Sequence, residues 1–143
     1  MSALYAYALS FMLIPYKWGG KVPLSGLDCS GLVCEILQAA GVLKTNEEMN
    51  AQQLHAMLML QANKTALGLG SLAFYGASPT QINHVAFFLN EHLVIEAGHG
   101  DSTVVTKDDA EKRGAYVRVR PYNYRGDLVA VIRPEYEMLG LTA

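Results

Sequence analysis

The stretch Gly26-Leu27-Asp28-Cys29-Ser30-Gly31-Leu32-Val33 changes from a loop to an apolar helix at Cys29. Before this point, residues 15–28 are rich in glycine and proline, which predicts a loop. After it, apolar residues recur at helical spacing over Cys29–Ala40, and Gly41 is a typical C-terminal stop. Because the free N–H groups and the dipole of a helix start favour an anion, Cys29 is a candidate thiolate nucleophile.

The other cysteine, Cys34, lies five positions further along the same predicted helix. At a helical rise of about 1.5 Å per residue the two Cα atoms lie beyond the roughly 7 Å that a disulfide spans, so we expect free thiols. Most free cysteines are small buried hydrophobes, and Cys34, next to Val33, fits that description. The spacing also differs from that of zinc ligands, so we expect no metal site and no cofactor.

The pattern of the chain changes from helical to β-rich near its middle. The other predicted helices are Ser2–Leu13, Thr45–Asn63 and Lys107–Arg113. We expect Pro15 to end the first, and Thr45 with Glu48 to form the capping box of the second. The predicted strands are Ser71–Tyr75, His84–Leu89, Leu93–Ala97, Ala115–Arg120 and Leu128–Arg133. This order predicts an α+β fold with N-terminal helices packed on a five-stranded, mostly antiparallel sheet.

The composition is that of a globular domain, with 51% hydrophobic and 17% charged residues over a length of 143. We therefore expect a single domain over residues 1–143. The net charge of −2 excludes a broad basic surface for nucleic acid, and no apolar run approaches the roughly 20 residues of a membrane helix. No basic residue precedes Lys17, so the charged start of a secretory signal is missing and we expect cytoplasmic synthesis.

A nucleophilic cysteine needs a base, usually a histidine, that a third polar group holds in place. Among the four histidines, His84 begins an apolar strand directly after a loop, where a scaffold presents a side chain rigidly. His55 lies within a helical segment and His92 in a turn, so we expect a structural and a solvated side chain. His99, between two glycines, stays a candidate for the third position.

Glu96 is the other candidate for the third position, because of strand register. If Asn90–His92 form a three-residue turn, Ala86 pairs with Glu96, and Glu96 shares the sheet face of His84. The two backbones are then diagonal neighbours about 7–8 Å apart, within reach of a long side chain. A two-residue turn would place Glu96 on the opposite face, and a glutamate on an edge strand that points into water is the competing interpretation.

Four segments together resemble the NlpC/P60 cysteine peptidases. They are Pro15-Tyr16-Lys17-Trp18-Gly19-Gly20, Asp28-Cys29-Ser30-Gly31-Leu32-Val33, Leu72-Ala73-Phe74-Tyr75 and His84-Val85-Ala86-Phe87-Phe88-Leu89. Their order and spacing agree with the family over roughly residues 10–100. The resemblance implies a papain-like α+β fold and a cysteine peptidase that cleaves amide bonds in the peptide stems of peptidoglycan, typically between D-γ-glutamate and a diamino acid.

Carried over by position, the resemblance makes Cys29 the nucleophile and His84 the general base. Glu96 falls at the third polar position, where a histidine is usual. The residues that match the substrate-binding and oxyanion region are Tyr16, Trp18 and Ser30. A second departure is Gly70-Ser71, which stands where the family has Gly-Asp. Beyond residue 100 three arginines, Arg118, Arg120 and Arg125, lie near a tyrosine-rich stretch. They could meet a carboxylate-rich peptide, but we expect them to be solvated strand edges.

Three other functions fit the same residues. The Cys–His pair could serve an amidase, acyltransferase or thioesterase on a non-wall substrate, or an intracellular isopeptidase. A component of a phage tail or assembly could also retain the fold without catalysis. Since no leader is seen, we expect the protein to act at the cell wall or in a phage particle, with phage or secretion-system proteins as partners, and with no nucleic acid or membrane.

Overall fold

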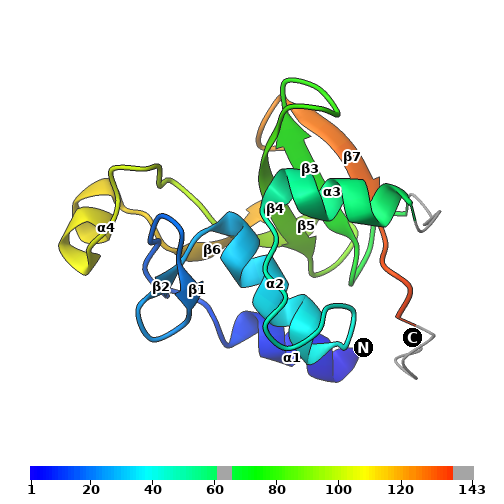
Figure 1. The fold of residues 1–143 in the computed structure, drawn as a ribbon, viewed down its shortest axis with the longest axis horizontal. Coiled ribbons are helices and arrows are strands. Elements are labelled where there is room, and N and C mark those ends of the chain that lie inside the picture. Colours follow the sequence, from blue (N-terminus) through cyan, green and yellow to red (C-terminus); the bar gives the residue numbers. More distant parts are fainter. Residues whose placement is uncertain (61–65, 137–143) are drawn as a thin grey trace.

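The computed structural model describes residues 1–60 and 66–136 (Figure 1). Its helices are α1 (Ser2–Leu9), α2 (Cys29–Ala39), α3 (Ala51–Met59) and α4 (Lys107–Arg113). Its strands are β1 (Lys21–Val22), β2 (Gly26–Leu27), β3 (Leu72–Gly76), β4 (Ile82–Phe88), β5 (Leu93–Ala97), β6 (Val117–Pro121) and β7 (Leu128–Ile132). The short strands β1 and β2 form a hairpin within the segment predicted as a loop.

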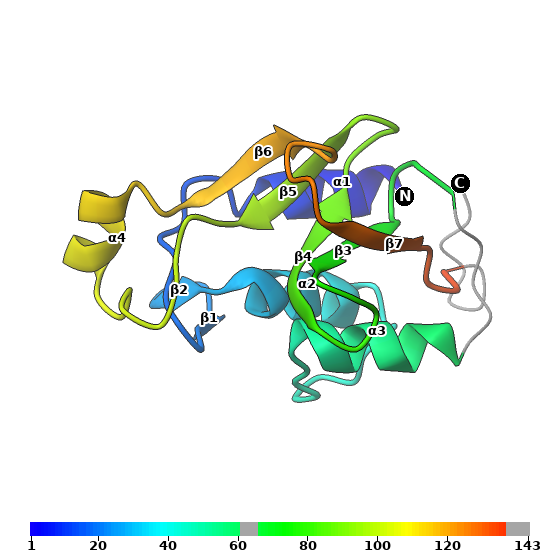
Figure 2. The same cartoon turned by 90° about the horizontal axis from the view of Figure 1, so that it is seen from above.

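The main sheet has the strand order β6-β5-β4-β3-β7, and all neighbouring strands are antiparallel. Helices α2 and α3 pack on the same side of β4, and α1 packs against α2 (Figure 2). The main core lies between these helices and the sheet, with Phe74, Phe87 and Ile95 pointing into it. The α+β class with a five-stranded antiparallel sheet is therefore confirmed.

The hairpin of β4 and β5 has the register that the three-residue turn predicts. Phe87 pairs with Ile95, Phe88 pairs with Val94, and the Leu89 N–H donates to the Leu93 carbonyl at 2.8 Å. The Asn90 side chain closes the turn by accepting the N–H groups of His92 and Leu93. This register turns Ala86, Phe88 and Val94 towards the face away from the helices, together with His84 and Glu96.

The first helix ends at Leu9 and not near Leu13, so the prediction that Pro15 ends it is wrong. The reason is tertiary, because the chain after α1 pairs with the start of β6. The Leu13 N–H donates to the Val117 carbonyl, and the Val117 N–H donates to the Ile14 carbonyl, both at 2.9 Å. These backbone bonds to β6 take the place of helical ones in the two residues before the proline.

The third helix begins at Ala51 and not at Thr45, so the predicted capping box is also wrong. Asn50 is the N-cap, and its box with Gln53 has both hydrogen bonds. Asparagine is a stronger N-cap than threonine, which explains the later start. The helix ends at Met59, and the predicted end at Asn63 lies outside the described residues. The helix Lys107–Arg113 is confirmed, with a capping box of Thr106 and Asp109.

Candidate active site

Cys29 is the first residue of α2 and is partly exposed. The preceding residue, Asp28, fixes this helix start, since one carboxylate oxygen accepts the Gly31 N–H at 2.7 Å and the other accepts the Gly19 N–H at 3.1 Å. A side chain at Gly31 would overlap the Gly20 carbonyl oxygen, so glycine lets the loop cross close to the helix. The N–H of Cys29, in the first turn of the helix, has no intrahelical acceptor.

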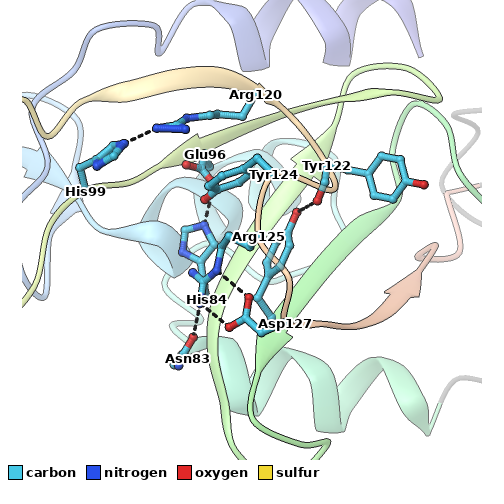
Figure 3. Close-up of polar contacts among 10 residues, drawn as sticks. Asn83, His84, Glu96, His99, Arg120, Tyr122, Tyr124, Arg125 and Asp127 are labelled. Atoms are coloured by element: carbon cyan, nitrogen blue, oxygen red, sulfur yellow. Dashed lines mark hydrogen bonds and ion pairs between the residues drawn. The ribbon is translucent and has the colours of Figure 1, made fainter.

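His84 and Glu96 form a buried pair on the neighbouring strands β4 and β5. His84 Nε2 lies 2.8 Å from Glu96 Oε1, and both side chains are almost inaccessible to solvent. The hydroxyl of Tyr124 donates to the same Glu96 oxygen at 2.5 Å. Figure 3 shows these three side chains pointing towards one another, and Tyr122 pointing away from them.

The electrostatics of the pair favour a charged imidazole. Burial acts to lower the pKa of His84, but hydrogen bonds and charge interactions with Cys29 and Glu96 outweigh it and raise that pKa to about 9. Burial acts to raise the pKa of Glu96, but its bonds with His84 and Tyr124 hold it below its usual value. Because Glu96 occupies Nε2, the other ring nitrogen, Nδ1, is left for the Cys29 sulfur.

The residues at this point surround a cleft of about 800 Å³. Its walls come from the loop before α2, the starts of α2 and α3, the start of β4, the loop after β5 and the residues Tyr124 and Arg125. Tyr16, Trp18 and Ser30 all line it. Tyr16 is buried, Trp18 is 54% exposed at the rim, and the Ser30 hydroxyl bonds to Asp28 at 3.3 Å. The predicted substrate-binding residues therefore face one cavity, and their roles stay predictions.

Tyr16 can offer a proton to the cleft. Burial and the negative charges of Cys29, Asp28 and Asp101 raise the pKa of its phenol, so the hydroxyl keeps its proton. A side chain at Gly100 would overlap the Tyr16 ring, so the loop after β5 packs directly against it.

The other three histidines and Cys34 do not contact the His84–Glu96 pair. His99 lines the cleft but is exposed, and its Nε2 contacts Arg120 and not His84, so Glu96 and not His99 lies against the base. His55 is buried edge-on against Phe74 with ring centroids 5.2 Å apart. His92 is exposed. Burial raises the pKa of the Cys34 thiol to about 11, and that sulfur bonds to a backbone carbonyl.

Arg118, Arg120 and Arg125 are each half-buried, so the expectation of solvated strand edges is wrong. Arg120 lies over the ring of Tyr124, 4.6 Å from its centroid, and Arg125 lies over the ring of Tyr75 at 5.1 Å. Arg125 also bonds to both carboxylate oxygens of Asp127, at 2.8 and 2.6 Å. Arg120 and Arg125 thus pack against aromatic rings around the His84–Glu96 pair. Tyr124 was missed because a loop tyrosine carries no periodic signal, although its place in a Tyr- and Arg-rich stretch was a clue.

The geometry can be compared with known proteins. The sequence model of the NlpC/P60 family matches residues 14–121. This chain belongs to the NlpC/P60 family. Dipeptidyl-peptidase 6 of Lysinibacillus sphaericus is 30% identical over 109 residues, which are 76% of this chain and 36% of that protein. The bifunctional muramidase/DL-endopeptidase CwlT of Bacillus subtilis (strain 168) is 34% identical over 84 residues, 57% of this chain and 24% of that protein.

The fold also matches RipD from Mycobacterium tuberculosis, described as a non-catalytic NlpC/p60 domain protein adapted to peptidoglycan binding. The TM-score is 0.62 at 21% identity, over 92% of this chain and 95% of that one. The papain-like NlpC/P60 fold is thus confirmed. The chain spans only about a quarter to a third of the length of the curated relatives it matches.

Within residues 1–60 and 66–136, no three histidine, cysteine or acidic side chains gather as a metal site would require. In the same part of the chain, no helix has the length and apolarity needed to cross a bilayer.

Proposed function

We propose that this protein is a cysteine peptidase that hydrolyses amide bonds in the peptide stems of peptidoglycan, of the D-γ-glutamyl–diamino acid endopeptidase type. The observation that carries the proposal is the position of His84 beside an open cleft, with its Nε2 2.8 Å from Glu96 Oε1 and its imidazole interacting with Cys29. Family membership supports it, as does the relative named as a DL-endopeptidase.

Under this proposal His84 serves first as an acid and then as a base. With a pKa of about 9 its ring is protonated at neutral pH and stabilises the Cys29 thiolate. The thiolate attacks the scissile carbonyl carbon, and the Cys29 N–H, with the Tyr16 hydroxyl as a second donor, stabilises the oxyanion. The C–N bond then breaks as His84 gives its proton to the leaving amine. Water adds to the thioester, returns a proton to His84 and releases the thiolate.

The lining of the cleft supports a polar peptide as the substrate. Besides the reacting groups, it presents charged and amide side chains, among them Lys21, Glu48, Gln53 and Asn83. An acyltransferase or thioesterase for lipid chains would not need these charged and amide groups beside the sulfur, whereas a peptide stem can bond to them.

The second candidate is a non-catalytic wall-binding or assembly protein, because RipD is described as non-catalytic with the same fold. In this chain Cys29 is partly exposed and His84 is partnered on both sides, an arrangement that a binding role alone does not require. A phage or secretion-system setting stays a prediction.

The test is digestion of defined muropeptides by the purified protein, with new amine termini detected by mass spectrometry. We expect cleavage by the wild type and by Cys34→Ala, which removes the buried thiol of the same helix. We expect none by Cys29→Ala or His84→Ala. Equal cleavage by wild type and Cys29→Ala would exclude the mechanism, and an inactive wild type that still binds the muropeptides would favour the second candidate.

A further inference from the structure

Tyr124 contacts the buried pair from a segment that the mechanism above does not use. It follows β6, and its hydroxyl donates to Glu96 Oε1 at 2.5 Å, the same oxygen that lies 2.8 Å from His84 Nε2. A carboxylate oxygen that accepts from two donors has both of its lone pairs engaged. Two such bonds restrict the orientation of the Glu96 carboxylate more than one bond would.

The surroundings of Glu96 limit its remaining freedom. A Cβ atom at Gly98 would lie 2.5 Å from Glu96 Oε2, so the second carboxylate oxygen occupies the space where another residue would have a side chain. The Tyr124 ring is itself held, because the Arg120 guanidinium lies 4.6 Å from its centroid. The carboxylate is therefore fixed by a donor that is fixed in turn.

We propose that Tyr124 is a positioning residue, which aligns the Glu96 carboxylate and through it the His84 ring towards Cys29. The functional chain of contacts then runs Cys29–His84–Glu96–Tyr124 across α2, β4, β5 and the segment after β6. The expected effect of Tyr124 on peptide cleavage rests on the proposed function, whereas its expected effect on the reactivity of the Cys29 thiol does not.

The protonation states agree with this role. Burial and the neighbouring Glu96 charge raise the pKa of the Tyr124 phenol, so it remains a donor over the working pH range. The charge on Glu96 persists because its pKa is lowered, with Arg120 among the causes. Tyr124 thus stabilises a carboxylate that in turn stabilises the imidazolium form of His84.

The catalytic arm of the test uses Tyr124→Phe, which keeps the ring and removes only the donor. We expect kcat on muropeptides to fall about tenfold with KM within about twofold of wild type, because the lost bond acts on the base and not on the substrate. In a Glu96→Ala background the same change should alter kcat by less than about twofold. The matched control is Tyr122→Phe, which removes a hydroxyl that points away from the pair, and should match wild type.

The second arm measures the rate of alkylation of Cys29 by iodoacetamide against pH, in a Cys34→Ala background. We expect the alkylation rate to reach half of its maximum at a higher pH in Tyr124→Phe than in the parent protein, which carries Cys34→Ala alone. The reason is that a poorly aligned imidazolium stabilises the thiolate less. Tyr122→Phe should not shift it.

Each outcome decides one claim. An inactive parent whose alkylation profile shifts in Tyr124→Phe overturns the proposed function and supports the positioning role. The positioning role is overturned if neither Tyr124→Phe nor Tyr122→Phe shifts the alkylation profile. It is also overturned if Tyr124→Phe lowers kcat equally with and without Glu96. A raised KM with an unshifted alkylation profile also overturns it, because Tyr124 would then contact substrate directly.

Discussion

The two faces of the main sheet are stabilised in different ways. The face covered by α2 and α3 is apolar, with Phe74, Phe87 and Ile95 packed against the helices. The opposite face combines a smaller apolar cluster around Phe88 with the charged His84–Glu96 pair. Apolar side chains need only volume and contact, whereas buried charges need partners with a defined geometry. The first face can therefore tolerate repacking, while the second depends on individual hydrogen bonds.

The largest expected loss of stability is on the helix-covered face. Phe87→Ala should lower the free energy of unfolding by about 3–5 kcal/mol, because it leaves a cavity between sheet and helices. Phe88→Ala, its neighbour on the other face, should lower it less, since its cluster is smaller. Urea unfolding of both variants measures the difference, and an equal loss for the two would remove the distinction between the faces.

The next effect is the pH dependence of stability that the His84–Glu96 pair contributes. The pKa of His84 is raised from 6.5 to about 9, so its contribution is present below about 6.5 and disappears as pH rises through 9. The pKa of Glu96 is lowered from 4.5, so its contribution disappears as pH falls below that value. The pair therefore stabilises most between these limits.

Glu96→Ala tests this pH range of stabilisation. It should lower the free energy of unfolding by on the order of 2 kcal/mol near neutral pH and by much less above pH 9. Exposed Glu91 provides the control, since Glu91→Ala should have almost no effect. Denaturant unfolding at several pH values measures it, and a loss independent of pH would mean that the carboxylate acts through packing alone.

The smallest effect concerns the space around the Glu96 carboxylate. Gly98→Ala should push that group away from His84, lowering stability by about 1 kcal/mol but kcat by about tenfold. Gly126→Ala is the matched control, because its Cβ would meet nothing within 4 Å. Should Gly98→Ala keep full activity, the carboxylate is not held as tightly as its contacts suggest.

The same comparison explains what the sequence could predict. The strands and the sheet face on which each side chain lies followed from the alternation of apolar and polar residues. The register that brings Glu96 beside His84 followed from a three-residue turn. The helix start at Cys29 followed from the change between loop and apolar periodicity. These are local patterns, and the structure places the three residues together as the patterns indicate.

Features that depend on distant partners were missed. The end of α1 is set by backbone bonds to Val117, about a hundred residues away. Tyr124 reaches Glu96 from a loop, and Arg120 stacks on that ring, so neither is revealed by periodicity. Side chains that complete a polar site from irregular segments need the tertiary structure to be found.

The central claim is that His84 is held between Cys29 and Glu96. Titration of its ring by ¹H–¹⁵N NMR, with the signal assigned from its loss in His84→Ala, tests this most directly. We predict a pKa of about 9 in the wild type and lower values in both Cys29→Ala and Glu96→Ala. A pKa near 6.5 in the wild type, or one that Cys29→Ala leaves unchanged, would contradict the account.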